Sequence, residues 1–322
     1  MEIKGRRVEV TGMQKKDKTK FLKLLGPVLQ IYSEKVVGKG EDAFASAVNE
    51  QAAMIGCFDG CGGIGSRRYS AFDTHTGAYV ASRVTAEAAL DWFLRCSETG
   101  DISSFSEYEL AEEIVTALKS CKDMETSGSA LKGSLTKDFP TTLSMAVTDA
   151  QQFLFLWAGD SRGYILDENG LHQMTKDDVD QTDAMRNLSD DGPLKNVVNA
   201  SKRFEIHKQE ICIRKACVVI TCTDGCFGYL ASPMSFELLL LDTLKAAESP
   251  KAWEALLKSE FAKVAGDDFT WMAIPIGFED FVQVKKSFAL RHDYMKSMHQ
   301  KIQHREAMLE WWESYRKEYE TF

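Results

Sequence analysis

The stretch ACVVITCTDG, residues 216–225, decides the fold. Its apolar run has the length and the β-branched composition of a buried strand, and the Asp224-Gly225 pair ends it. Residues 52–60 (AAMIGCFDG) repeat this pattern and end at Asp59-Gly60, and residues 151–160 (QQFLFLWAGD) end at Asp160. An Asp-Gly pair also forms ordinary turns. The pattern is therefore open to two interpretations, a set of turns or a set of carboxylates gathered at one rim of a sandwich.

The order of elements outward from this stretch favours an α+β chain. It predicts strands, two helices, more strands, two helices and a last strand, which fits helical layers around a β-sandwich better than βαβ alternation. The predicted strands are 28–37, 52–58, 141–149, 151–158, 162–166, 203–213, 216–223 and 269–276. The predicted helices are 78–95, 106–121, 234–246 and 250–264. The long polar stretch 175–200 is expected to be functional because idle loops of that length are uncommon.

Composition narrows the function classes. Of 322 residues, 44% are hydrophobic and 27% are charged, which is typical of a globular protein. The longest apolar runs fall short of the roughly 18 residues of a membrane span, and the start lacks the apolar core of a signal peptide. We therefore expect a cytoplasmic protein that binds no membrane, and we expect its eight cysteines to be reduced. Their CxxxC spacings do not favour a zinc site.

Charge is distributed unevenly along the chain. The first 24 residues carry eight basic and three acidic residues, and residues 281–322 carry eight basic and six acidic ones. Because the whole chain has a net charge of −9, residues 25–280 have a net charge of −16. So acidic a body is a poor surface for nucleic acid, whose phosphates need Lys and Arg partners. It is a good source of ligands for cations.

Further acidic residues lie at strand boundaries. Glu41 and Asp42 follow the Gly38–Gly40 break, and Asp267 directly precedes the last predicted strand. If these residues join Asp59, Asp160 and Asp224 at one rim, the carboxylates repel one another unless cations lie among them or some stay protonated. An all-oxygen donor set without His or Cys suits Mg²⁺ or Mn²⁺.

Several motifs, in order along residues 28–277, resemble those of the type-2C (PPM) metal-dependent serine/threonine protein phosphatases, in particular the bacterial-like members. They are GEDAF (Gly40–Phe44), CFDGCGG (Cys57–Gly63), FPTTLSMAV (Phe139–Val147), WAGDSRGYIL (Trp157–Leu166), LHQMTKDD (Leu171–Asp178), VVITCTDGCF (Val218–Phe227) and GDDFTWMAI (Gly266–Ile274). The resemblance implies a four-layer α-β-β-α sandwich of two antiparallel sheets flanked by helix pairs. It also implies a metal centre at the rim of the sandwich.

The resemblance assigns a role to each acidic residue. Asp59 is expected to bridge two Mn²⁺ or Mg²⁺ ions, with the Gly60 carbonyl as a further ligand. Asp224 and Asp267 are expected to hold the first ion, and Glu41 to reach the second through water. Asp42 is expected to hydrogen-bond a metal-bound water, and Asp160 with Asp224 to form a third, weaker metal site. Asp59, Asp224 and Asp42 are thus the candidate catalytic residues.

The sequence departs from the family pattern at several positions. Val37 replaces an Arg that binds substrate phosphate in many members, which leaves Lys35 and Lys39 as weaker candidates because a lysine lacks the guanidinium fork. Cys61 replaces a His that is a proposed general acid. Gly228 replaces an acidic ligand of the third metal site. Asp268 stands where the family has Asn, so that Asp267 is the preferred ligand and Asp268 the fallback.

The expected activity is hydrolysis of phosphoserine and phosphothreonine in proteins by a metal-activated water, in signalling opposed by a serine/threonine kinase. Two metals lower the pKa of a water and neutralise the phosphoryl oxygens, so no protein nucleophile is needed. One alternative is a catalytically impaired signalling or scaffold module that kept the fold. The other is a two-metal phosphatase of a small phosphorylated metabolite.

Four cysteines lie two residues from candidate ligands: Cys57, Cys61, Cys222 and Cys226. They are interpreted as small apolar core residues or, alternatively, as oxidation-sensitive thiols beside the metals.

Three regions are predicted: a basic N-terminal arm (1–24), a catalytic domain (25–280) and a C-terminal helical extension (281–322). In the extension, Phe281, Phe288, Met295, Ile302 and Leu309 recur every seven residues, with Val284, Met298, Trp312 and Tyr319 beside them. This apolar stripe is expected either to pack on the chain's own body or to pair with itself or another protein. His292, His299 and His304 are expected at the surface.

Overall fold

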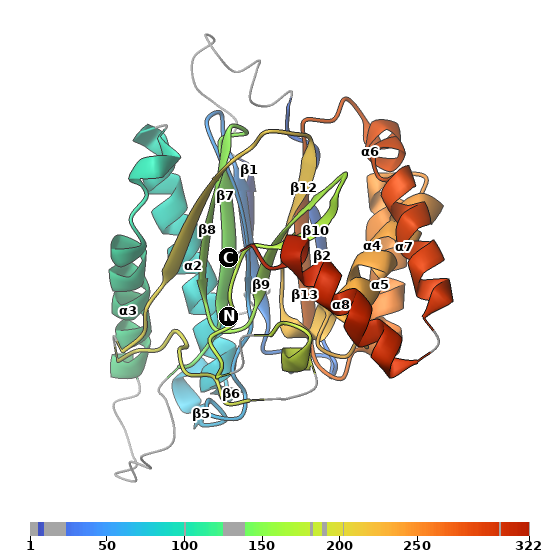
Figure 1. The fold of residues 1–322 in the computed structure, drawn as a ribbon. Helices are drawn as coiled ribbons and strands as arrows, with labels where there is room; N and C mark the ends of the chain where they lie inside the picture. The colour runs from blue at the N-terminus through green and yellow to red at the C-terminus, as the bar shows by residue number, and fades with distance from the viewer. Residues whose placement is uncertain are drawn as a thin grey trace.

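A computed structural model describes residues 6–9, 24–99, 101–124, 139–180, 183–188, 192–201, 203–302 and 304–321 (Figure 1). Most of the N-terminal arm and residues 181–182 and 189–191 of the long polar stretch lie outside these ranges. No helix in the described ranges is long and apolar enough to cross a membrane.

Two sheets stacked face to face form the centre of the molecule (Figure 1). The six-stranded sheet has the order β1 (Arg6–Glu9), β3 (Ala43–Val48), β4 (Ala53–Phe58), β7 (Leu143–Thr148), β8 (Gln152–Ala158), β11 (His207–Cys212). The five-stranded sheet has the order β10 (Gly170–Gln173), β9 (Arg162–Asp167), β12 (Cys217–Cys222), β13 (Phe269–Ile276), β2 (Leu29–Ser33). Neighbouring strands are antiparallel except β1, which pairs with β3 in parallel. Apolar side chains from both inner faces fill the space between the sheets.

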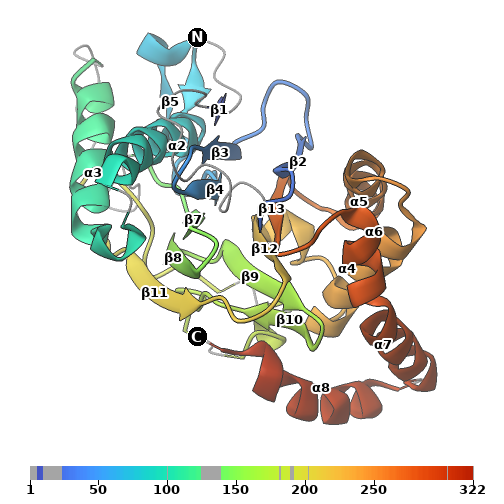
Figure 2. The same cartoon turned by 90° about the horizontal axis from the view of Figure 1, so that it is seen from above.

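Helix pairs cover the two outer faces, as the view from above shows (Figure 2). Helices α2 (Gly77–Cys96) and α3 (Glu107–Met124) cover the six-stranded sheet, and α4 (Pro233–Ala246) and α5 (Pro250–Val264) cover the five-stranded sheet. The N-terminus of α4 is capped by Ser232 and that of α5 by Ser249, and each helix has Pro at its first position, where a missing N–H costs nothing. The predicted four-layer α-β-β-α sandwich is therefore confirmed.

Five of the described strands were not predicted: β1, β3, β10, β5 (Arg68–Tyr69) and β6 (His75–Thr76). In β3 the residues facing α2 are Ala43, Ala45 and Ala47, each about 1% exposed. Alanine has little strand preference, so the close approach of a helix rather than local propensity sets this strand. Strands β5 and β6 form a two-stranded hairpin that precedes α2.

The C-terminal extension forms three helices: α6 (Phe281–Ser287), α7 (Ala289–Lys301) and α8 (Arg305–Tyr319). Its apolar stripe packs on the chain's own body: Val284, Phe288, Met295, Trp312 and Tyr319 are all buried in the cluster that also contains α4 and α5 side chains. Helix α7 contacts α4, and α8 contacts β10 (Figure 2). Of the two expectations for the stripe, packing on the chain's own body is therefore the one that this structure shows.

The predicted surface position of one histidine in the extension is wrong. His292 is about 3% exposed, and its Nε2 lies 2.7 Å from Asp242 Oδ1 on α4. It is buried because α7 turns that side chain toward α4. His299 and His304 are exposed, as predicted.

Candidate metal centre

The antiparallel register brings the candidate carboxylates to one rim. Ala43, the first residue of β3, faces Phe58 at the end of β4, and Leu143 at the start of β7 faces Ala158 at the end of β8. In the other sheet, Cys222 at the end of β12 faces Trp271 near the start of β13. The candidate residues adjoin these strand ends: Asp42, Asp59, Asp160, Asp224, Asp267. Strands from both sheets thus deliver their carboxylates to the same end of the sandwich.

Burial and, after it, mutual repulsion act on these carboxylates. Burial raises the pKa of Asp59 well above its usual range, and the charges of Asp42, Asp224, Asp160 and Asp267 raise it further. Burial is also the main cause that raises the pKa of Asp160, followed by the charge of Asp224. Negative charges crowded in a poorly hydrated place favour protonation or the binding of cations.

Asp42 is the most deeply buried member of the group, at about 1% exposed. Its Oδ2 accepts hydrogen bonds from the hydroxyls of Thr223 and Thr270, both at 2.8 Å. Burial raises the pKa of Asp42 to about 8, although these two hydrogen bonds oppose the shift.

Asp59 is held through its backbone. Its carbonyl oxygen accepts from Thr142 N at 2.7 Å and from Thr141 Oγ1 at 2.7 Å, and its N–H donates to Thr142 Oγ1 at 3.0 Å. The next residue must be glycine, because a Cβ at Gly60 would lie 2.7 Å from the backbone oxygens of Ala78 and Glu41. The two threonines are functional residues that the sequence interpretation missed, although they stand in the quoted motif FPTTLSMAV.

Glu41 lies beside the cluster with its side chain half-buried. The Thr76 hydroxyl, which also caps α2, donates to Glu41 Oε1. Burial raises the pKa of Glu41, Asp268 and Asp267 add to the shift, and Thr76 and Arg68 oppose it. Arg83 was also missed: its guanidinium is buried beneath this loop and donates to Gly40 O at 3.0 Å and Glu41 O at 3.5 Å. An arginine on the apolar side of a helix was the available signal.

Asp267 and Asp268 differ in what their carboxylates bind. Asp268 Oδ1 accepts from Lys35 N at 2.7 Å, and its Oδ2 accepts from Glu41 N at 2.7 Å. Both carboxylate oxygens of Asp268 therefore bind the backbone of the loop that carries Glu41. Asp267 is exposed, and its Oδ1 accepts from Asp268 N at 2.8 Å. This arrangement leaves Asp267 better placed than Asp268 to face a cation.

The two lysine candidates for substrate phosphate lie on the exposed turn before Glu41. The Lys35 ammonium donates to the Gly266 carbonyl, and Lys39 is exposed. Val37, at the position of the family's arginine, is 91% exposed. Arg68 donates through Nη1 to Thr74 O at 2.9 Å. Its positive charge opposes the rise in the pKa of Glu41 that burial causes.

Three of the four nearby cysteines, Cys57, Cys222 and Cys226, are buried. Burial raises the pKa of the Cys57 and Cys226 thiols well above the usual range, which keeps them protonated and poorly nucleophilic. Cys61 is partly exposed. The three buried thiols therefore match the core-residue interpretation.

The chemistry of this donor set fits Mn²⁺ or Mg²⁺, because the side chains that converge are carboxylates and their neighbours are hydroxyls and carbonyls. Within the described ranges, no three Asp, Glu, His or Cys side chains already lie close enough together to hold one ion.

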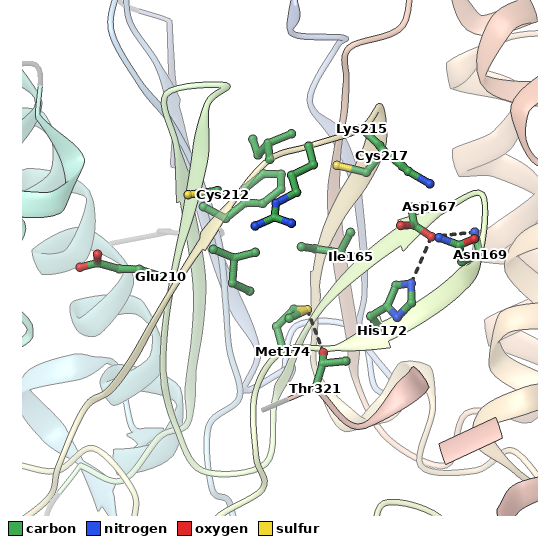
Figure 3. A pocket seen from close by; sticks show the side chains of 14 residues that line it. Ile165, Asp167, Asn169, His172, Met174, Glu210, Cys212, Lys215, Cys217 and Thr321 are labelled. Carbon is green, nitrogen blue, oxygen red and sulfur yellow. Dashed lines mark hydrogen bonds and ion pairs between the residues drawn. The ribbon is translucent and has the colours of Figure 1, made fainter. Parts of the chain in front are cut away.

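A separate cavity of about 560 Å³ opens between the edge strands β10 and β11 (Figure 3). Its lining is mostly apolar, with Phe153, Ile165 and Ile211, and it carries Arg214 and Lys215. None of the candidate metal-site residues lines this cavity.

Residues 39–259 match the family model described as protein phosphatase 2C. The chain belongs to the protein phosphatase 2C family. Membership confirms the resemblance and the enzyme class inferred from the motifs, a protein phosphatase. Comparison with curated protein sequences finds no significant match.

Solved structures of this phosphatase fold are similar to the chain at low sequence identity. The Mycobacterium tuberculosis serine/threonine phosphatase PstP/Ppp has a TM-score of 0.57 at 17% identity, covering 79% of this chain and 100% of that one. A C. elegans sex determining protein has a TM-score of 0.58 at 17% identity, covering 81% of this chain and 67% of that one. The catalytic domain of PstP in complex with two manganese ions has a TM-score of 0.52 at 17% identity, covering 79% and 100%.

Proposed function

We propose that this protein phosphatase 2C member hydrolyses phosphoserine and phosphothreonine in proteins with the help of Mn²⁺ or Mg²⁺ held at the carboxylate rim. The observation that carries the proposal is the convergence of carboxylates from both sheets, where burial and, after it, the neighbouring carboxylate charges raise the pKa of Asp59 and Asp160. The two manganese ions bound by PstP support the choice of metal.

Each residue of the rim has a proposed task. Asp59 and the Gly60 carbonyl lie on backbone that Thr141 and Thr142 hold in place, so Asp59 would help to hold both cations and the Gly60 carbonyl would help to hold one of them. Asp224 and Asp267 complete the first ion's ligands, and Glu41, oriented by Thr76, serves the second through water. Asp160 with Asp224 is assigned to a third, weaker site, because Gly228 supplies no further carboxylate.

Asp42 is assigned to orient the attacking water. Both threonine hydroxyls bind its Oδ2, so Oδ1 is the oxygen we assign to the water. When bound, two divalent cations lower the pKa of water, neutralise phosphoryl oxygens and align an in-line attack. The chain's own contribution is to hold the carboxylates at the rim and to keep Asp42 away from bulk solvent.

The replacement of the family's arginine by Val37 bears on substrate binding rather than on the metal site. Arg68 and Lys35 are the cations that we assign to the substrate phosphate, Arg68 because it acts on Glu41 and Lys35 because it adjoins Gly266. An opposing serine/threonine kinase and a cytoplasmic location remain part of the proposal.

Release of inorganic phosphate tests this function. Wild-type protein should release phosphate from a phosphothreonine peptide with Mn²⁺, lose that activity in EDTA and regain it when Mn²⁺ is restored. Asp59→Asn should reduce turnover by roughly 10² or more. A matched control is Asp149→Asn, in the turn at the opposite end of the β7–β8 hairpin, where Oδ1 accepts from Gln151 N at 2.8 Å.

The same assay separates the alternatives. Turnover of p-nitrophenyl phosphate and of phosphorylated metabolites, with none of the phosphopeptide, would indicate a metabolite phosphatase. No turnover of any substrate across Mn²⁺ and Mg²⁺ concentrations would indicate a signalling module that has lost catalysis. Full activity in chelator would contradict the proposed metal chemistry.

A further inference from the structure

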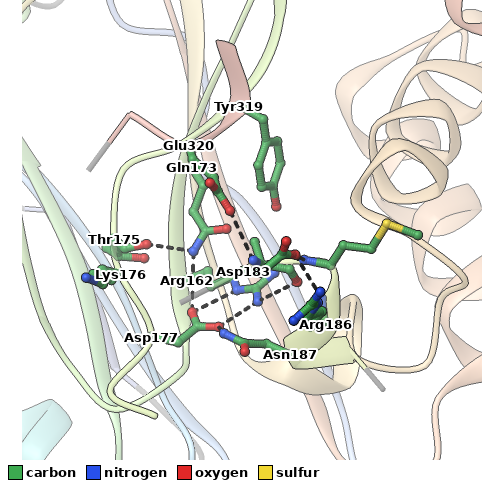
Figure 4. Close-up of polar contacts among 12 residues, drawn as sticks. Arg162, Gln173, Thr175, Lys176, Asp177, Asp183, Arg186, Asn187, Tyr319 and Glu320 are labelled. Carbon is green, nitrogen blue, oxygen red and sulfur yellow. Dashed lines mark hydrogen bonds and ion pairs between the residues drawn. The ribbon is translucent and has the colours of Figure 1, made fainter. Parts of the chain in front are cut away.

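A buried arginine links the rim to the long loop after β10 (Figure 4). Arg162, two residues after Asp160, donates through Nε to Asp177 Oδ1 at 2.9 Å and through Nη2 to Asp177 Oδ2 at 2.6 Å. The Arg162 and Asp177 side chains are 1% and 5% exposed. Arg162 also stacks on Phe227, 4.3 Å from the ring centroid, three residues after Asp224. Arg162 therefore links the segment that follows Asp160, in which it lies, to the segment that follows Asp224.

The loop is tied to the turn that carries Asp160. Asp178 N donates to Gly159 O at 3.0 Å, and Gly159 N donates to Asp178 Oδ2 at 2.9 Å. The position of residues 177–178 thus bears on the position of Asp160.

The segment of residues 183–188 packs on the other side of the same arginine. Arg162 Nη2 donates to Ala184 O at 3.4 Å, and Asn187 Nδ2 donates to Asp177 Oδ2 at 2.9 Å (Figure 4). The 183–188 segment therefore touches both members of the buried ion pair.

Helix α8 holds this segment by charged contacts. Arg316 Nη1 lies 3.0 Å from Asp183 Oδ2, and the Trp312 indole N–H donates to the same oxygen at 3.3 Å. Glu320 Oε1 accepts from Ala184 N at 3.0 Å, and its Oε2 accepts from Arg316 Nε and Nη2 at 3.1 and 2.9 Å. The Arg316 guanidinium thus binds both Asp183 and Glu320, and the Glu320 carboxylate accepts the hydrogen bond from Ala184 N.

We infer that the C-terminal extension is part of the catalytic architecture: Arg316 of α8 and Glu320, directly after α8, are positioning residues that hold the 183–188 segment, and through Asp177 and Arg162 they hold the turn of Asp160. The part of this inference that concerns catalysis rests on the proposed function; the part that concerns the segment does not. These contacts are partly buried, with Arg316 29% and Asp183 14% exposed, so water screens them less than it screens a surface pair.

Amide hydrogen exchange of the metal-free, full-length chain tests the contacts directly. Arg316→Ala should speed exchange in residues 177–180 and 183–188 by about tenfold, the effect of losing a charge-assisted hydrogen bond. Arg316→Lys should lie between it and the wild type, because a lysine cannot engage both carboxylates as a fork. Lys317→Ala is the matched control: it removes the same charge from the neighbouring, exposed position. Glu320→Gln retains the shape of the side chain and supplies a second test if Arg316→Ala does not fold.

Kinetics test positioning against a purely structural role. Arg316→Ala should raise the Mn²⁺ concentration for half-maximal hydrolysis of p-nitrophenyl phosphate by roughly tenfold, and Arg316→Lys should recover part of the loss. Unchanged exchange at 177–180 and 183–188 in a folded Arg316→Ala protein would overturn the contacts. Faster exchange with unchanged metal dependence and kcat would overturn the positioning role. A wild type inactive with every metal would refute the proposed function, and hydrogen exchange would still decide whether α8 holds the segment.

Discussion

The Asp42 carboxylate joins the two sheets: its Oδ2 accepts a hydrogen bond at 2.8 Å from the hydroxyl of Thr223. Asp42 directly precedes β3 of the six-stranded sheet, and Thr223 directly follows β12 of the five-stranded sheet. This hydrogen bond therefore joins the edges of the two sheets and holds the Asp42 carboxylate in a buried position. Burial there raises the pKa of Asp42 to about 8. We therefore expect folding stability and metal binding to be coupled at this residue.

The first prediction concerns pH. Because burial raises the pKa of Asp42 to about 8, the folded metal-free protein binds more protons than the unfolded chain between the ordinary pKa of Asp, about 4, and pH 8. Its free energy of unfolding should therefore fall as pH rises through that window. The raised pKa values of Asp59 and Asp160 act in the same direction. Thermal melts of metal-free protein from pH 5 to pH 8.5 measure this fall.

Mn²⁺ should reverse that trend, because cations bind the ionised carboxylates and compete with protons. The rise in melting temperature on adding a fixed Mn²⁺ concentration should be larger at pH 8 than at pH 6. A rise that is equal at the two pH values, or a metal-free protein that becomes more stable as pH increases, would refute the electrostatic description of the rim.

The second prediction is that Asp42→Asn separates stability from activity. The amide oxygen can still accept from Thr223 and Thr270, while the buried charge is removed. Because the unfolded carboxylate ionises far below pH 8, the stability that the metal-free variant gains over the wild type should grow with pH, and it should be on the order of a few kcal/mol larger at pH 8.5 than at pH 5. Turnover should fall by about 10² or more, since the group assigned to orient the water is lost. A variant that is less stable at both pH values would mean that Asp42 acts mainly as a structural anion.

The third prediction distinguishes two neighbouring carboxylates. Asp268→Ala removes the acceptor of two backbone N–H groups, those of Lys35 and Glu41, and should cost about 1–3 kcal/mol of unfolding free energy. Asp267→Ala changes an exposed residue and should cost less than about 1 kcal/mol. Its effect should instead be a weaker affinity for Mn²⁺, measured by titration calorimetry. The reverse assignment, with weaker metal binding only in Asp268→Ala, would make Asp268 the ligand.

The sequence predicted the layers and the rim because both depend on local patterns. Apolar runs ending in Asp, as at Asp59 and Asp224, show where buried strands stop, and antiparallel pairing then brings such ends together. The supporting contacts depend on residues far apart in the chain. The hydroxyls of Thr141 and Thr223, the guanidinium of Arg83 and the carboxylate of Asp268 acquire their tasks only when elements distant in the sequence come together in the fold.

The C-terminal extension shows a second limit of the sequence. The seven-residue spacing indicated a helical apolar stripe, but its partner was left open. Tertiary packing decides the matter, because buried residues such as Trp312 and Tyr319 lie against the body rather than toward solvent. The burial of His292 also depends on tertiary packing, because its Asp242 partner lies on α4 and not on its own helix.

The fourth prediction tests that packing. Arg291 on α7 pairs with Glu237 on α4 through Nε at 2.6 Å and Nη2 at 3.0 Å, and the Glu237 side chain is fully buried. Arg291→Ala leaves this carboxylate without its cation and should cost about 3–5 kcal/mol. Lys296→Ala, which removes an exposed pair with Asp242, should change stability by less than about 1 kcal/mol. Equal melting temperatures for the two variants would mean that the extension adds little to the body.

The most direct test of the central claim, that carboxylates from both sheets hold the catalytic metal ions, is anomalous X-ray scattering from crystals grown with Mn²⁺. We predict peaks beside Asp59, between it and the Asp224 and Asp267 carboxylates, and their loss in crystals of Asp59→Asn. Phosphatase activity that depends on Mn²⁺, combined with anomalous peaks only elsewhere on the molecule, would contradict the account.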